Sequence, residues 1–291
     1  MIFRSPEDEQ RYKDAYYHTL STWPISYKER KVQTSFGLTH IIEAGSEDAP
    51  PLVLMHGMGV SSTMWGGNIQ PLSEKFHVFA IDTMGDMSLS QPEKYPKNRE
   101  DYANWLEEVL DGLELKKTRM LGMSYGGWQI LNYAISSCER IEKIALCAPA
   151  AAFAPISLPF ILLGLPLLIY PTRRYTHFYM KWPAILPDDD PKYYELYDPL
   201  IDQMYTGWKY GKVKHRVIPT VYTDEELQSI DVPVLLMVGE HEKLYSAERV
   251  FKRAEKCLPQ PTTLCIPDAS HDLTIRQRDL INQEVLAFME S

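Results

Sequence analysis

Short apolar runs alternate with amphipathic stretches along most of the chain. Six runs of five to eight mostly apolar residues end at turn residues, which is typical of strands buried on both faces. These runs are residues 51–57, 77–83, 118–123, 141–148, 232–239 and 262–266. Residues 31–36 and 39–44, around Gly37, predict an antiparallel hairpin at the sheet edge. The alternation predicts an α/β fold with a mostly parallel central sheet flanked by helices.

Helical spacing fills the gaps between the predicted strands. Residues 102–113 and 128–138 each carry apolar side chains every three or four positions, which predicts helices that pack on the sheet. Ser5, followed by Pro6 and acidic residues, predicts a helix start near the N-terminus. Residues 280–288 predict a closing amphipathic helix.

The alternation lapses between residues 151 and 230, where aromatic residues and prolines interrupt a helical pattern. We therefore predict a core domain of residues 1–150 and 231–291, with residues 151–230 inserted as a helical cap. An insertion after the strand that ends near Cys147 would lie over the carboxyl ends of the strands, where such sheets bind ligands. The candidate substrate-binding residues in it are the aromatic Phe160, Tyr170, Tyr175 and Trp182.

Residues 153–170, FAPISLPFILLGLPLLIY, carry no charge over eighteen positions. This length reaches the lower limit for a membrane-spanning helix. Pro155, Pro159 and Pro166 argue against a span because each would break or kink a continuous helix. We expect an apolar lid and no integral membrane span. The sequence leaves open whether this surface faces a substrate, a second subunit or lipid, and it leaves the oligomeric state open.

Composition and charge narrow the classes of function. The 291 residues are 45% hydrophobic and 24% charged, as in ordinary globular proteins. Thirty basic against thirty-nine acidic residues give a net charge of −9 without a basic block, so nucleic acid is not an expected partner. The N-terminus turns charged at Arg4 and the four cysteines are widely separated, which predicts a cytoplasmic protein with free thiols. No motif implies a metal or an organic cofactor.

The stretch LGMSYGGW places Ser124 between Gly122 and Gly126 in a G-x-S-x-G pattern. The pattern alone also fits a glycine-rich turn. Here it joins a predicted strand to a predicted helix, which is the context of a nucleophile elbow. Strand and helix pass so closely there that the positions two before and two after the serine must lack a Cβ atom. We therefore predict that Ser124 is a catalytic nucleophile.

A serine hydroxyl needs a base to accept its proton and a carboxylate to orient that base. In this kind of fold the three residues come in the order serine, acid, histidine. The histidines that follow Ser124 are His177, His215, His241 and His271. Only His271, in IPDASHD, also follows the last strand and the acidic loop before it. Chain order therefore selects His271 as the base.

The identity of the acid stays open between two neighbouring glutamates. VGEHEKLYS follows a predicted strand and offers Glu240 and Glu242, while Asp231 and Asp268 are further candidates. A loop at a strand end places the acid a few residues past the strand glycine, and Glu242 is third after Gly239. We prefer Glu242 and interpret Glu240 as a solvated loop carboxylate.

Backbone amides are the donors expected to stabilise the oxyanion, because they are in place before the reaction begins. One amide should belong to Tyr125, directly after the serine. The other should belong to Met58, in the turn MHGMG that ends the first central strand. His56 in the same turn is expected to brace the loop.

HGMG, GMSYGG, GEHE and ASHD together resemble the α/β-hydrolase fold superfamily. The longer stretches EDAPPLVLMHGMGVSSTMW, IDTMGDMSLSQP, DYANWLEEVLDGL and TDEELQSIDVPVLLMVGEHEKLY are similar to the Bacillus-type carboxylesterase NP, or naproxen esterase, family. The likeness runs from about Thr34 onward and is weakest between residues 153 and 216. Met87 and Ser270 depart from the superfamily, which commonly has glycine at both positions, and we expect Met87 to reshape the pocket rim.

The resemblance implies Ser124 as nucleophile, Glu242 as acid and His271 as base, with the Met58 and Tyr125 amides as the oxyanion hole. It favours Glu242 over the neighbouring glutamate. The expected function is a serine carboxylesterase that hydrolyses apolar or aryl esters through an acyl-enzyme. The same triad also serves carbon–carbon bond hydrolases, lactonases, thioesterases and perhydrolases, and a non-catalytic ligand-binding protein is a third alternative.

Overall fold

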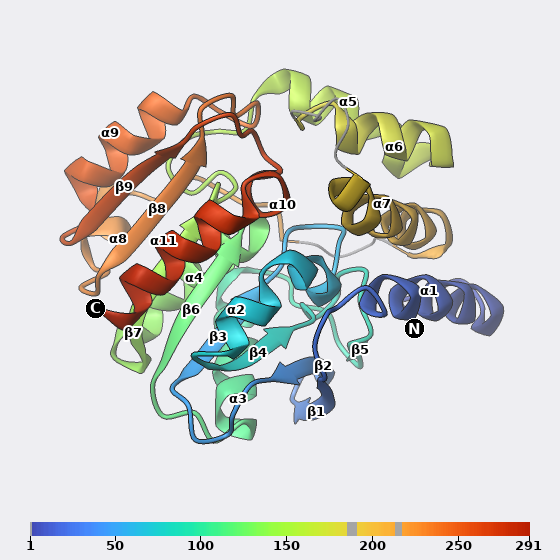
Figure 1. The fold of residues 1–291 in the computed structure, drawn as a ribbon, viewed down its shortest axis with the longest axis horizontal. Helices are drawn as coiled ribbons and strands as arrows, with labels where there is room; N and C mark the ends of the chain where they lie inside the picture. Colours follow the sequence, from blue (N-terminus) through green and yellow to red (C-terminus); the bar gives the residue numbers. More distant parts are fainter. Residues whose placement is uncertain (1, 185–190, 213–216) are drawn as a thin grey trace.

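The computed structural model describes residues 2–184, 191–212 and 217–291. The described residues form one nine-stranded sheet in the order β1-β2-β4-β3-β6-β7-β8-β9, with β5 (Gln91–Pro92) paired to β2 (Figure 1). The parallel strands are β3 (Pro51–Met55), β4 (His77–Ile81), β6 (Thr118–Met123), β7 (Ile141–Cys147), β8 (Val234–Gly239) and β9 (Pro261–Ile266). The antiparallel edge consists of β1 (Lys28–Thr34) and β2 (Gly37–Ala44). The predicted fold class is confirmed.

Helices cover both faces of the sheet, and alternate strand residues point to the two layers. In β3, Val53 and Met55 pack in one apolar cluster, whereas Leu52 and Leu54 pack in the other. One layer contains α3 (Arg99–Gly112), α4 (Tyr125–Ser137), α8 (Asp224–Gln228) and α9 (Ala247–Cys257). The other contains α1 (Pro6–Leu20), α2 (Ile69–Ser73), α7 (Pro191–Tyr210), α10 (Leu273–Arg276) and α11 (Arg278–Glu290), and the 3₁₀ turns are η1 (Ser62–Gly67) and η2 (Cys138–Arg140). Burial on both faces explains why the strands read as continuous apolar runs.

Two strands end two residues before the ends of their predicted apolar runs. The first predicted strand, 51–57, ends at Met55, and the second, 77–83, ends at Ile81. The backbone beyond them bonds to loops: the Gly57 amide donates to Met64 Sδ at 3.4 Å, and the Thr83 amide donates to His56 Nε2 at 2.9 Å. These residues belong to the carboxyl edge of the sheet.

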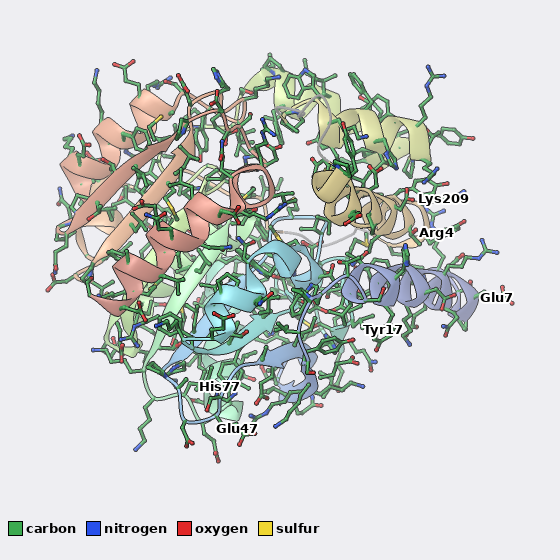
Figure 2. All side chains as sticks on the ribbon, in the orientation of Figure 1. Arg4, Glu7, Tyr17, Glu47, His77 and Lys209 are labelled. Atoms are coloured by element: carbon green, nitrogen blue, oxygen red, sulfur yellow. The ribbon has the colours of Figure 1, made fainter. Side chains whose placement is uncertain are left out.

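The N-terminal helix begins as predicted and packs against a helix far away in sequence. Ser5 Oγ accepts the Asp8 amide at 3.1 Å, which caps α1. α1 lies beside α7 (Figure 1), and Thr19 Oγ1 donates to the Pro199 carbonyl at 3.1 Å. Near the start of α1 and the end of α7, where Figure 2 labels Arg4 and Lys209, the Arg4 amide donates to the Tyr210 carbonyl at 3.2 Å. The N-terminal segment therefore holds α7 against the body of the protein.

The uncharged stretch forms a short helix, α5 (Leu158–Ile169). Pro159 lies in its first turn, where an amide has no helical acceptor. Pro166, expected to break or kink a continuous helix, does not break α5, because the helix continues through it to Ile169. The carbonyl that loses its donor belongs to Leu162, which is 54% exposed, so water can satisfy it. Among the described residues, no helix is both long and apolar enough to cross a membrane.

The helices α5 and α6 (Arg173–Lys181) form one edge of the molecule, and α7 lies between them and α1 (Figure 1). Tyr175 Oη of α6 donates to the Leu163 carbonyl of α5 at 2.8 Å. Residues 185–190 and 213–216 of the predicted cap, and with them His215, lie outside the described residues.

Candidate active site

Ser124 occupies the sharp turn between β6 and α4. Its φ of 51° and ψ of −112° lie in a region that residues with a Cβ atom rarely adopt. Two backbone hydrogen bonds hold this conformation: the Ser124 amide donates to the Cys147 carbonyl at 2.8 Å, and the Ala150 amide donates to the Ser124 carbonyl at 2.9 Å. The neighbouring strand end therefore enforces the strained turn that presents the serine side chain.

The glycines on either side of Ser124 allow the strand and the helix to approach closely. A Cβ atom on Gly122 would lie 2.6 Å from the Gly127 nitrogen, and one on Gly126 would lie 2.1 Å from the Met55 carbonyl oxygen. Both distances are shorter than any real Cβ contact, so the backbone would have to shift. The spacing G-x-S-x-G thus reflects steric exclusion at both glycine positions.

The structure brings Ser124, His271 and Glu242 into one hydrogen-bonded series. His271 Nε2 lies 3.0 Å from Ser124 Oγ, and His271 Nδ1 lies 3.0 Å from Glu242 Oε2. The other Glu242 oxygen accepts the amides of Lys243 and Leu244, each at 2.8 Å. Because an ionised carboxylate only accepts, Nδ1 carries the hydrogen and Nε2 is left to accept the serine proton.

The surroundings of His271 shift its proton affinity. Burial disfavours the charged ring, but the charge and hydrogen bond of Glu242, together with the charge of Asp272, outweigh it and raise the pKa of His271 above 6.5. The His271 side chain is 14% exposed, and that of Glu242 is fully buried. The histidine is therefore strengthened as a base by a carboxylate that water does not screen.

The loops that carry Glu242 and His271 are tied together. The His241 amide donates to the Ala269 carbonyl at 2.9 Å, and Ser270 Oγ donates to the His241 carbonyl at 2.8 Å. A Cβ atom on Gly239 would lie 2.5 Å from the Ala269 carbonyl oxygen. Ser270, which replaces the glycine common at this position, thus links the two loops.

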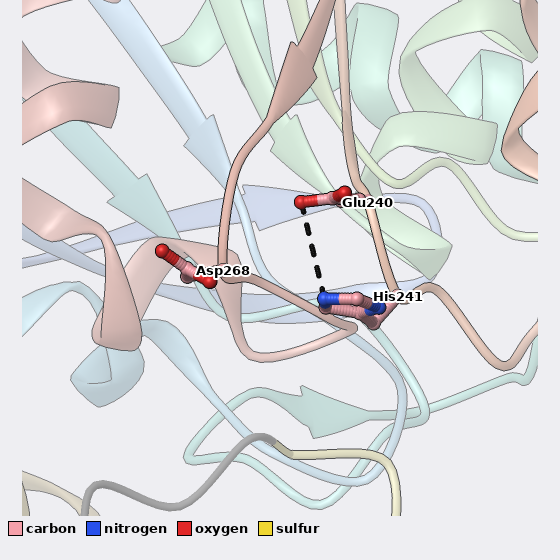
Figure 3. Close-up of side chains that lie close together, drawn as sticks. All are labelled: Glu240, His241 and Asp268. Carbon is pink, nitrogen blue, oxygen red and sulfur yellow. Dashed lines mark ion pairs between the residues drawn. The ribbon is translucent and has the colours of Figure 1, made fainter.

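The other acidic candidates lie on the surface. Glu240, His241 and Asp268 form an exposed group whose potential ligand atoms lie within 4.8 Å of one another, and Figure 3 shows their side chains. His241 Nε2 and Glu240 Oε2 are 3.8 Å apart. Asp231 accepts a hydrogen bond from Gln260 at 3.2 Å. The group in Figure 3 has the residue types of a metal site, but all three side chains are exposed, which gives it the character of a solvated ion pair.

The loop after β3 passes directly beside Ser124, because β3 pairs with β6. A Cβ atom on Gly57 would lie 3.7 Å from Ser124 Cβ. Both carboxylate oxygens of Asp86 accept the Gly59 amide, at 3.1 and 3.2 Å. Met58 lies between these two anchored glycines, and Tyr125 begins α4 directly after the serine. The two predicted oxyanion donors therefore come from segments that adjoin Ser124.

His56 uses both ring nitrogens to hold this loop. The Thr83 amide donates to His56 Nε2 at 2.9 Å, so Nδ1 carries the hydrogen and donates to the Gly57 carbonyl at 2.7 Å. The ring is fully buried. His56 braces the loop, as expected.

A buried polar network that no sequence motif indicated lies behind the loop that carries Met58. Asp82 Oδ1 accepts the Ser62 amide at 2.9 Å, and Asp82 Oδ2 lies 3.0 Å from His40 Nδ1 and 3.1 Å from Tyr16 Oη. Burial disfavours the Asp82 carboxylate, but the hydrogen bond and charge of His40, with smaller contributions from His56 and the Ser62 amide, lower its pKa to about 2. The signal was an aspartate directly after β4, at the same sheet edge as Ser124.

The four aromatic candidates for substrate contact lie in different places. The Phe160 ring lies 5.8 Å from the His271 ring and 6.3 Å from the Trp182 ring, as measured between centroids. Tyr175 packs between α5 and α6, and Tyr170, at the end of α5, is 78% exposed. The structure therefore brings Phe160 to the site, with Trp182 behind it, and leaves Tyr170 on the surface.

Met87 lies under α7. It is 1% exposed, and its carbonyl accepts a hydrogen bond from Tyr12 Oη. A Cβ atom on Gly207 would lie 3.0 Å from Met87 Cβ, and one on Gly211 would lie 2.5 Å from Met87 Sδ. The side chain expected at the pocket rim thus packs between α1 and α7.

A parallel sheet with a serine at a strand-to-helix turn, in hydrogen-bonded series with a histidine and an acid from later strand ends, is the arrangement of an α/β-hydrolase. Residues 50–275 match the family model described as the alpha/beta hydrolase fold. The chain belongs to this family, as its motifs predicted.

Two curated relatives from Bacillus subtilis match almost the whole chain. The uncharacterized carboxylesterase nap is 36% identical over 97% of this chain and 93% of its own length, and carboxylesterase YbfK is 36% identical over 99% and 97%. The crystal structure of naproxen esterase (carboxylesterase NP) from B. subtilis superposes with a TM-score of 0.89 at 34% identity, covering 98% of this chain and 99% of that one. That of carboxylesterase CesB (YbfK) has a TM-score of 0.90 at 36% identity, covering 97% and 98%. The predicted resemblance to this esterase family is confirmed.

Proposed function

We propose that the protein is a serine carboxylesterase in which Ser124 is the nucleophile, His271 the general base and Glu242 the acid that orients it. The observation that carries this proposal is the continuous series of 3.0 Å contacts from Ser124 Oγ through the imidazole to the buried carboxylate. Relatives that align over nearly the whole chain are carboxylesterases, which supports ester hydrolysis as the reaction.

The reaction proceeds in two displacements. His271 Nε2 accepts the hydroxyl proton while Ser124 Oγ attacks the ester carbonyl carbon, and the imidazolium then protonates the departing alcohol. Water attacks the resulting acyl-enzyme with His271 again as base, which releases the acid and restores the serine. In both steps the amides of Met58 and Tyr125 stabilise the negative oxygen, and Asp86 holds the loop that carries one of them.

We propose that residues 151–230 act as a cap whose inner side contacts the acyl or aryl group of the substrate. The Phe160 ring beside His271, with Trp182 behind it, supports an apolar substrate, because burying an apolar group against aromatic rings removes both from water. A small-molecule ester is thus the proposed substrate. The cytoplasmic location stays a prediction.

Hydrolysis of p-nitrophenyl esters from acetate to palmitate tests the proposal. We expect Ser124→Ala to lose turnover by about 10⁴-fold or more, because removing a triad nucleophile leaves only binding and the oxyanion donors. The matched control is His241→Ala, which removes an exposed histidine next to the acid. Equal activity of Ser124→Ala and wild type would refute the nucleophile. A folded, inert wild type that reacts with a fluorophosphonate would point to another reaction of the same triad.

A further inference from the structure

The outward side of α5 is an exposed apolar stripe. Its members recur every three or four residues, and we call them the outer face of α5: Leu158, Ile161, Leu162, Leu165, Leu168 and Ile169. Their exposed fractions run from 42% to 82%, and Leu167 is the helix's one buried residue. Soluble proteins rarely leave so many neighbouring large apolar side chains in water unless the surface meets a partner or a lipid.

The charge around this face is biased toward one sign. Residues 143–187 contain no Asp or Glu, although the chain has 39 acidic residues among 291. The helix that follows α5 begins with the exposed Arg173 and Arg174 and ends with Lys181. Arg173 pairs with Asp202 of α7, and Lys181 lies 3.5 Å from Asp198. The α5–α6 edge is therefore apolar and contributes no acidic residue of its own, and it carries the exposed Arg174, on a protein whose net charge is −9.

The same helix reaches the catalytic residues with its other side. Phe160 of α5 contacts the His271 ring, whereas Leu158, Ile161 and Leu162 around it are 47% to 65% exposed. α5 thus faces the candidate active site with Phe160 and faces solvent with its outer face. A surface that meets the outer face would lie on the opposite side of α5 from the contact between Phe160 and His271.

We propose that the outer face of α5 docks on an anionic lipid surface. An apolar helical stripe with adjacent cations matches a helix that lies in the interface, with its apolar side among the acyl chains and its cations near acidic headgroups. A second copy of the chain fits less well, because a two-fold interface would place the α5–α6 edge of one copy against the same edge of the other, and residues 143–187 offer no acidic partner for the exposed Arg174. The inference goes beyond ester hydrolysis and does not depend on it.

Co-sedimentation with lipid vesicles tests the proposal. Wild type should bind vesicles that contain phosphatidylglycerol more tightly than vesicles of phosphatidylcholine alone. Leu162→Asp with Leu165→Asp should weaken that binding by at least about tenfold, since each loses the transfer of a leucine into lipid. Arg174→Gln should weaken binding to the anionic vesicles by about fivefold and leave neutral vesicles unaffected.

The matched control is Ile218→Asp, which charges a 75% exposed apolar residue outside α5 and α6 and should leave binding unchanged. Far-UV circular dichroism reports that each variant is folded, and Leu162→Gln with Leu165→Gln replaces the Asp variant if the latter aggregates. Absence of vesicle binding by wild type, equal binding by the double variant, or equal binding to neutral and anionic vesicles overturns the proposal. A wild-type dimer that dissociates in the double variant, without vesicle binding, assigns the face to a second copy.

Discussion

The strand ends around Ser124 and the helix α5 above them are fixed in opposite ways. At the strand ends, steric exclusion at Gly122 and Gly126 and backbone bonds to neighbouring strands leave the serine one conformation. In α5, one residue of twelve is buried, and the contacts to the body come through a few side chains such as Phe160. The proposed catalytic residues thus lie on strand ends that the core holds in place, whereas α5 is attached through a small contact area.

This difference separates two kinds of substitution. A change at the strand ends should alter the chemical step and leave surface binding intact. A change on α5 should alter the binding of a substrate or a lipid surface and leave the geometry of Ser124, His271 and Glu242 intact. Pairs of variants, one from each region, therefore measure how independent the two regions are.

Glu242→Gln should have the largest effect of the variants that keep the serine. The amide keeps the shape of the side chain but offers its NH₂ group to His271 Nδ1, which favours the wrong tautomer, so kcat should fall by about 10³- to 10⁴-fold. Steady-state hydrolysis of p-nitrophenyl butyrate measures the loss. Glu240→Gln, whose side chain is 53% exposed, is the control and should stay within about twofold of wild type. The reverse ranking would transfer the role of the acid to Glu240.

The pH profile of kcat/KM should show an acid limb with a midpoint above pH 6.5. The neutral imidazole is the base, and the Glu242 carboxylate raises the pKa of His271, so activity is retained above that pKa. Below it, each pH unit should cost about tenfold, because the fraction of neutral imidazole falls by that factor. A buffer series with a soluble ester gives the profile. A midpoint below 6.5 in wild type would contradict the raised pKa.

Phe160→Ala should have the smallest effect. The ring contributes apolar contact that is the same in the ground state and the transition state, so KM for an aryl or long-chain ester should rise by about two- to tenfold with kcat nearly unchanged. Phe178→Ala is the matched control, because Phe178 is 50% exposed and packs against Tyr175. A large fall in kcat for Phe160→Ala would show that α5 also positions His271.

Much of the fold could be predicted because its strands and helices follow from local patterns of apolar and capping residues. The continuous apolar runs became parallel strands, and the capping residue Ser5 marked the start of α1. The predicted element boundaries differ from the structure where contacts with distant parts of the chain set the local backbone. The predicted strand 51–57 extends two residues beyond the end of β3, because His56 and Gly57 form hydrogen bonds outside the sheet. Pro166 is accommodated inside α5 because that helix lies at the surface.

The residues of the candidate site could be predicted from the sequence to a similar extent. The G-x-S-x-G motif between a strand and a helix indicated Ser124, and chain order selected His271, since only one histidine follows the last strand. Chain order could not identify the acid, because Glu240 and Glu242 lie two positions apart in one loop. The position of Asp82 directly after β4 was a local signal, but the roles of Asp82 and Asp86 could not be predicted, since their partners come from elsewhere in the chain.

The sequence by itself determined the order of strands and helices, the turn at Ser124 and the apolar, acid-free character of residues 143–187. These properties depend on neighbours a few positions apart. The tertiary structure alone decided that His271 meets a serine 147 positions away and a glutamate 29 positions away, and that α5 turns Phe160 inward and its leucines outward. Such contacts depend on how the sheet and the helices pack, because packing sets which distant side chains share one volume and which remain in water.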